Sequence, residues 1–432
     1  MIGRGDGAPG IARIRSLFAD PAVRWLAGAR IISLVAAPIA LYLLITRQPL
    51  SARGFYFIAI NVTALGQLFE TGMGTLVVQF AVRVRPSERG ILRGAAERWF
   101  MRAAVTFLAI AGTAGTLVLA DGATTASVAF LVPWAVVLVC TAAYVRLVPL
   151  ICMLEGGGDT DGVQRMRAAQ SVAIAAAVIL GLWSGRGIGA AAWAAVAQLA
   201  VAAIFVFRSR RHFPETDPPV GRLADQYRRE QARSAPVWIA AWLAPQLLTP
   251  AVMLFRGATP AGELGLHVAL ALAPAMLSVA WMHARYPRLG ALVAAGALRT
   301  FDDTARHAFT QALLVFASAS AALVVLGFAA PTLFPFLAGR VISPALLTVL
   351  LIGNLVIVVF QAMLAWFRAF ADERFSVQVV IACTAMAMGG AGGAALGGAM
   401  GAAGGYAAVG VIVALILGVG FARLRTQRLA SA

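Results

Sequence analysis

The sequence carries little charge for its length and contains no lysine, so its 35 basic residues are all arginine. Only 12% of the 432 residues are charged, whereas soluble proteins carry about 25%, and 61% are hydrophobic. The mean hydropathy is +0.84. This composition leaves little room for a soluble domain and predicts an integral membrane protein. The lack of lysine also excludes a phosphate-binding loop that ends in Gly-Lys-Ser or Gly-Lys-Thr.

Cysteine and histidine are also scarce. The three cysteines, Cys140, Cys152 and Cys383, lie in apolar runs, which indicates buried thiols rather than a disulfide or metal framework. No His/Cys cluster has the spacing of a metal site, and no catalytic set is found. We therefore expect no metal, no cofactor and no catalytic residues. The loops predicted outside the membrane are short, which counts against enzymes that polymerise or ligate glycans there.

Twelve apolar segments are predicted to cross the membrane, which takes about 20 residues. They are residues 24–46, 54–82, 103–120, 126–154, 169–184, 189–207, 236–256, 264–283, 306–329, 344–367, 377–397 and 402–422. With both termini in the cytoplasm, 28 arginines lie at the inner side and 5 in outer loops, while Arg30 and Arg146 remain within spans. Arginine accumulates on the cytoplasmic side of membrane proteins, so this asymmetry predicts cytoplasmic termini. It also indicates that the arginines are topology signals and not a nucleic-acid surface.

The two halves of the chain repeat each other. Pro38 matches Pro250 at an offset of 212, and Pro133 matches Pro344 at an offset of 211. We predict an all-α protein of two six-helix lobes related by a parallel internal repeat. The predicted division is a cytoplasmic amphipathic segment at 1–22, an N-terminal lobe at 23–207, a cytoplasmic linker at 208–235, a C-terminal lobe at 236–422 and a cytoplasmic tail at 423–432.

The span at 54–82 carries a carboxylate, Glu70, near its middle. A charge at that depth costs a few kcal/mol or more unless a partner compensates it. Glu70 is therefore either half of a structural ion pair or part of a polar path through the membrane. Arg30 and Arg146 lie about 10 and 12 Å from the inner ends of their spans, at about 1.5 Å per residue, so we expect at least one of them near Glu70.

Two arginines against one carboxylate would form a net positive pocket. Guanidinium groups bind phosphate oxygens in pairs, so such a pocket would suit a pyrophosphate. The alternative for each arginine is that its side chain extends to the inner interface. Gln67 shares a helical face with Glu70 and would hydrogen-bond a sugar or a neighbouring side chain. His267 is a possible coupling group, together with Glu70, or a hydrogen-bonded core histidine.

Several patches of the sequence resemble bacterial polysaccharide flippases of the Wzx type. The patches are GFY at 54–56, LFETGM at 68–73, QFA at 79–81, GL at 265–266, YPRL at 286–289 and LFPFL at 333–337. The first three are similar to the second helix of these flippases. The next two are similar to the matching helix of the second half, and the last to the loop between the ninth and tenth helices.

This resemblance implies a member of the multidrug/oligosaccharidyl-lipid/polysaccharide (MOP) superfamily with a MATE-like fold. Such proteins have two six-helix lobes around a cavity that opens alternately to each side. The implied substrate is an oligosaccharide on polyprenyl pyrophosphate, moved from the inner to the outer leaflet of the bacterial plasma membrane for polysaccharide biosynthesis. The implied partners are this lipid-linked glycan, the bilayer and polysaccharide polymerase or assembly proteins.

Two other functions remain open. A MATE-like antiporter for drugs or other small molecules would share the fold, but we would expect it to have more acidic groups in its cavity for binding cations. A non-transporting scaffold of a glycan-assembly complex would have no use for charges buried in its spans, so Glu70, Arg30 and Arg146 argue against it.

Overall fold

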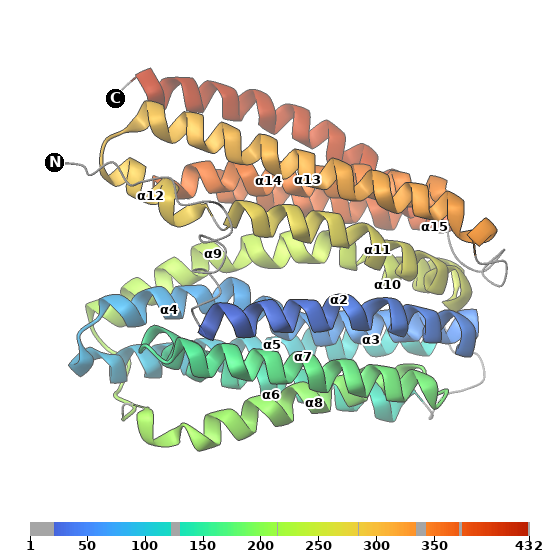
Figure 1. The fold of residues 1–432 in the computed structure, drawn as a ribbon, viewed down its shortest axis with the longest axis horizontal. Coiled ribbons are helices and arrows are strands. Elements are labelled where there is room, and N and C mark those ends of the chain that lie inside the picture. Colours follow the sequence, from blue (N-terminus) through green and yellow to red (C-terminus); the bar gives the residue numbers. More distant parts are fainter. Residues whose placement is uncertain are drawn as a thin grey trace. The chain divides into compact units, whose positions relative to one another are not determined.

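The computed structural model describes residues 21–430, except 122–129, 214, 284, 334–342 and 371–373. The regular elements within these residues are helices (Figure 1). The α-helices are α2 (Pro21–Arg47), α3 (Leu50–Leu68), α4 (Gly74–Arg83), α5 (Arg89–Asp121), α6 (Leu131–Gly156), α7 (Thr160–Trp183), α8 (Ile188–Arg208), α9 (Arg222–Gln246), α10 (Leu248–Arg256), α11 (Ala258–His283), α12 (Tyr286–Ala294), α13 (Leu298–Leu333), α14 (Pro344–Ala369) and α15 (Arg374–Ala430). The predicted all-α fold class is confirmed.

The predicted spans lie on these helices, although some spans are interrupted. Within the described residues, eight helices are long and apolar enough to cross a membrane, and α9 with α10, bent by 44°, makes a ninth. The last two predicted spans both lie on α15, which is broken at Gly397 and Gly398. The chain is thus a multi-pass membrane protein. Residues 1–20 of the predicted N-terminal segment, the start of the span at 126–154 and most of the LFPFL patch fall outside the described residues.

The helices cluster into two compact units. The first unit consists of Met1–Gln48, Val62–Thr113 and Val128–Arg229, and the second of Pro49–Asn61, Ala114–Ser127 and Glu230–Ala432. Helix α3 therefore begins in the second unit and ends in the first. The chain enters the second unit for the last time between Arg229 and Glu230, within the segment predicted as a linker.

The order of helix packing repeats from one unit to the other. In the first unit α2 packs on α7, α4 on α6, and α6 on α8. In the second unit α10 packs on α15, α12 on α14, and α14 on α15. Helix α6 begins at Leu131 and α14 at Pro344, 213 residues later, close to the predicted offset. The two halves of α15 take the places of α7 and α8, and the predicted internal repeat is confirmed.

Glycine allows the two halves of α15 to pack closely. A Cβ atom added to Gly393 would lie 2.0 Å from the carbonyl oxygen of Gly401, so no larger residue fits there without a shift of the backbone. Arg256 at the end of α10 donates hydrogen bonds of 2.7 and 2.9 Å to the carbonyls of Ala395 and Leu396. The last carbonyls of a helix lack intrahelical donors, so Arg256 caps the first half of α15.

Candidate functional site

Glu70 lies in a single π-helical turn, Phe69–Met73, between α3 and α4. Such turns place an extra residue within a helix and are frequent at functional sites. The next residue, Gly74, lets this segment approach α6, because a Cβ atom there would lie 2.6 Å from the sulfur of Cys152. Glu70 is buried, with 5% of its surface exposed. The π turn and the glycine together place its carboxylate against α6.

Both carboxylate oxygens of Glu70 accept hydrogen bonds. The hydroxyl of the buried Tyr144, on α6, donates to Oε2. The Nε of Arg167, on α7, donates to Oε1 over 2.6 Å. The other two nitrogens of this guanidinium donate to the two oxygens of Glu155, at 2.9 and 2.8 Å. Arg167 therefore bridges two carboxylates, and the network joins the π turn to α6 and α7.

The Glu70 network carries more negative than positive charge. Glu70 and Glu155 contribute two negative charges and Arg167 one positive charge, so the formal sum is −1. The shared guanidinium and the hydroxyl of Tyr144 compensate much of the cost of burying these carboxylates. Within the described part of the chain, no three His, Cys, Asp or Glu side chains are arranged to hold a metal ion.

The partner of Glu70 differs from the arginines named by the sequence analysis. Arg167 is one of the 28 arginines assigned to the inner side, and Glu155 directly follows the predicted span at 126–154. The signal that could have found them is the short connection between Gly156 and Thr160. It makes α6 and α7 an antiparallel pair, so the long side chain of Arg167, two turns into α7, can reach back to Glu155 at the end of α6.

Arg146 lies on α6 but outside the Glu70 network. It is exposed and continues an exposed stripe with Val132 and Val139, whereas Tyr144 is buried. It lies ten residues before Gly156, or about 15 Å along the helix at about 1.5 Å per residue. It forms no ion pair with the carboxylates that the structure describes. Its role in substrate binding stays a prediction.

Two other predicted site residues, Arg30 and Gln67, lie on described helices, α2 and α3, but their side chains fall outside the described part of the structure. Their predicted contacts with Glu70 or with substrate are therefore still predictions.

His267 joins α11 to the start of α14. It is 1% exposed. Its Nε2 accepts a hydrogen bond of 2.8 Å from the backbone N–H of Ser343, so the ring proton is assigned to Nδ1, which lies 2.7 Å from the carbonyl of Glu263. This is the geometry of a hydrogen-bonded core histidine, one of the two interpretations of the sequence. A coupling role for His267 stays a prediction.

Comparison with known proteins identifies the fold. No protein-family model matches the sequence, and no curated protein matches it. Solved structures of a multidrug resistance MATE family transporter of the MOP superfamily do match. The inward-facing structure has a TM-score of 0.63 and 15% identity over 92% of this chain and 98% of that one. The outward-facing structure has a TM-score of 0.60 and 15% identity over 99% and 100%.

A MOP superfamily transporter from Pyrococcus furiosus is also similar, with a TM-score of 0.57 and 14% identity over 94% of this chain and 96% of that one. Its binding pocket is described as having reverse polarity, with a different function suggested for it. Sequence identities this low establish a shared fold and no more. The chain therefore has the fold of MATE transporters over nearly its whole length.

Proposed function

We propose that this protein is a transporter that moves an oligosaccharide linked to polyprenyl pyrophosphate across the bacterial plasma membrane by alternating access. The fold supports transport, because solved structures that share it are multidrug resistance transporters in inward-facing and outward-facing conformations. The patches that resemble polysaccharide flippases, above all LFETGM at 68–73, favour a glycan-lipid substrate. The arginine asymmetry supports cytoplasmic termini.

The contrast between Glu70 and Arg146 carries the proposal. Both oxygens of the buried Glu70 already accept hydrogen bonds, so this carboxylate is not available to bind a cationic substrate directly. Arg146 is exposed along a spanning helix. A charge within a span is costly and marks functional sites, and a guanidinium binds phosphate oxygens in pairs. We infer that this exposed face of α6 lines the transport path, where an arginine together with an occupied carboxylate favours an anionic substrate.

The test uses purified protein in proteoliposomes loaded with a polyprenyl-pyrophosphate oligosaccharide. The measurement is the fraction of glycan that becomes accessible to a glycan-cleaving enzyme added outside. Arg146→Gln should lower the rate about tenfold or more, because hydrogen bonds to charged groups contribute about 1.5–3 kcal/mol. Arg146→Lys should be partly active, since an ammonium keeps the charge but loses the paired geometry.

The matched control is Arg165→Gln. Arg165 lies at the start of α7, where its side chain is 62% exposed and pairs with Asp161. Its loss should leave the rate unchanged. An Arg146→Gln protein that is produced normally and transports at the rate of the parent would show that Arg146 only extends toward the interface, and the pyrophosphate proposal would fail.

A second candidate function is a MATE-like antiporter for small molecules. The observation that favours it is the −1 formal charge of the Glu70 network, because a net negative charge attracts a cation to its neighbourhood. The test is uptake of a cationic dye by the same proteoliposomes under a pH gradient. Dye uptake that Glu70→Gln abolishes, without glycan-lipid transfer by the parent protein, would favour the antiporter. Activity in neither assay would favour the scaffold.

A further inference from the structure

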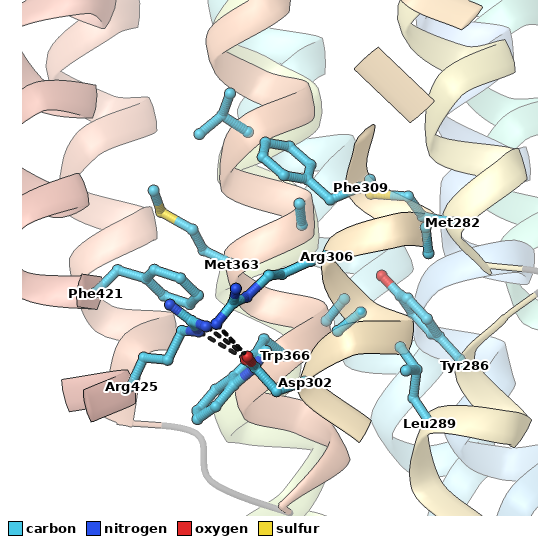
Figure 2. A pocket seen from close by; sticks show the side chains of 15 residues that line it. Met282, Tyr286, Leu289, Asp302, Arg306, Phe309, Met363, Trp366, Phe421 and Arg425 are labelled. Carbon is cyan, nitrogen blue, oxygen red and sulfur yellow. Dashed lines mark hydrogen bonds and ion pairs between the residues drawn. The ribbon is translucent and has the colours of Figure 1, made fainter. Parts of the chain in front are cut away.

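A second charged cluster lies in the second unit, beside a cavity of about 230 Å³ (Figure 2). The cavity is lined by side chains of five helices, α11 to α15. Its charged members are Asp302, Arg306 and Arg425, and Figure 2 shows them at one side of the cavity, with aromatic and methionine side chains around the rest. This cluster is separate from the Glu70 network of the first unit.

Asp302 is fully occupied by its neighbours. Arg425 donates to both of its oxygens, through Nε over 2.6 Å and through Nη2. The indole of Trp366 donates to Oδ1 over 3.3 Å. Arg306 adds an ion pair of 2.8 Å to Oδ2. These contacts fix α13, α14 and α15 to one another at the cavity and leave the carboxylate no room for a further cation.

The arginines of this cluster are in excess. Two guanidinium groups against one carboxylate give a formal charge of +1. The side chain of Arg306 is 63% exposed, and its contact to Asp302 occupies one of its five N–H donors. The next carboxylate on the helix, Asp303, is exposed and does not line the cavity, although its charge acts on Arg425. Arg306 can therefore offer donors to an anion at the cavity.

The remaining walls are apolar, from Met282, Phe309, Met363 and Phe421 among others (Figure 2). A cavity with guanidinium donors at one place and apolar walls elsewhere suits an amphipathic anion better than a small inorganic anion. The cavity is smaller than the roughly 300–1,000 Å³ of sites that enclose a whole drug-sized ligand. It would therefore hold a head group and the first part of a chain, while the rest of the chain lies outside it.

The place of the cavity along the spans agrees with such a ligand. Its lining residues Met282, Arg306, Trp366 and Arg425 lie at or near the ends of predicted spans that face the cytoplasm. The cytoplasmic leaflet carries anionic lipids, and basic residues near that surface attract them.

We propose that this cavity binds the phosphate group of a lipid from the inner leaflet. The phosphate lies on Arg306 and Arg425, and the start of the apolar chain lies between Met282, Phe309 and Met363. Two guanidinium groups would also bind inorganic phosphate. The experiment therefore distinguishes a lipid phosphate from free phosphate. The proposal does not depend on which substrate the protein transports.

The experiment measures ligand binding to the full-length protein in neutral detergent by native mass spectrometry. The probes are dioleoyl phosphatidic acid, dioleoylglycerol, which has the same chains without phosphate, and inorganic phosphate. Phosphatidic acid should bind about tenfold or more tightly than dioleoylglycerol, because its phosphate accepts charge-assisted hydrogen bonds from the guanidinium groups. Equal binding of the two lipids would overturn the proposal.

Two substitutions in α13 test whether Arg306 binds the phosphate. Arg306→Gln keeps the Asp302–Arg425 pair and should lower the affinity for phosphatidic acid about tenfold. Arg299→Gln, at an exposed position of the same helix that does not line the cavity, should leave the affinity unchanged. Equal effects of the two substitutions would show binding by general surface charge and would overturn the site.

A third variant separates lipid from free phosphate. Ala305 lines the cavity, so Ala305→Leu removes space without changing any charge. It should weaken phosphatidic acid binding several-fold while the melting temperature stays within a few degrees of the parent. If inorganic phosphate binds, competes with phosphatidic acid and is as tight in Ala305→Leu as in the parent, the cavity is a site for free phosphate and the lipid proposal is wrong.

Discussion

The charged clusters of the two units have opposite charge balance. In the first unit Arg167 holds Glu70 and Glu155, with a formal sum of −1. In the second unit Arg306 and Arg425 hold Asp302, with a formal sum of +1. The order of helix packing repeats between the units, but the charges do not. The repeat therefore provides a common framework, and the side chains placed on it give each unit its own electrostatic character.

The clusters also differ in the burial of one member. The central pairs are equally buried, with Glu70 and Asp302 both 5% exposed. The third members differ, because the side chain of Glu155 is 18% exposed and that of Arg306 is 63% exposed. Charges that are removed from water depend on their partners more strongly than charges at a surface. The first cluster should therefore contribute more to stability, and the second should be more accessible to ligands.

The largest loss of stability is expected from Arg167→Gln. This substitution leaves the carboxylates of Glu70 and Glu155 buried without their shared cation, and breaking a buried pair costs about 3–5 kcal/mol. Thermal unfolding of the detergent-purified protein should shift to a clearly lower temperature. Arg165→Gln, which breaks an exposed pair two residues earlier, is the control and should change stability by less than about 1 kcal/mol. Similar shifts for both would show that the Glu70 network does not stabilise the protein.

A smaller loss is expected from Asp302→Asn in the second cluster. Arg425 and Trp366 both lose a charged acceptor, at about 1.5–3 kcal/mol for hydrogen bonds to a charged group, but Arg306 is already largely in solvent. Asp303→Asn is the matched control at the adjacent, exposed position. If Asp302→Asn destabilises the protein more than Arg167→Gln does, the proposed ranking of the two clusters is reversed.

Each unit has a buried tyrosine whose hydroxyl donates one hydrogen bond, so the strengths of these two bonds can be compared. Tyr144 donates to the carboxylate of Glu70, and Tyr406 donates to the amide oxygen of Asn354 over 3.0 Å. Replacing each with Phe keeps the ring. The loss should be about 1.5 kcal/mol or more for Tyr144 and about 1 kcal/mol for Tyr406, because the first acceptor is charged. Equal shifts in unfolding temperature would show that the hydrogen bond to Glu70 is no stronger than the one to Asn354, and the comparison would fail.

The smallest effect on stability is expected from Arg306→Gln. Its ion pair to Asp302 is largely exposed, and such pairs contribute about 0–1 kcal/mol. The unfolding temperature should hardly change, although lipid-phosphate binding falls. A large loss of stability would mean that Arg306 is a structural member of the second cluster, like Arg425, and is not free to bind a ligand.

The sequence by itself determined the spans, the repeat and the presence of a carboxylate at depth. Span length, hydropathy and the depth of Glu70 are properties of a continuous segment, so they can be counted along the chain. The nearly equal offsets of matching prolines between the halves are also a property of the chain, and the repeated helix order agrees with them.

Only the tertiary structure decided which charges meet. Depth along a helix does not say which way a side chain faces or which helix lies beside it. Arg146 and Tyr144 are two residues apart on α6, yet one is exposed and the other binds Glu70. Arg167 reaches Glu70 because α7 folds back along α6, and Arg425 reaches Asp302 across 123 residues of sequence. An ion pair depends on distances of a few ångströms between helices, and those distances come from packing, not from position in the sequence.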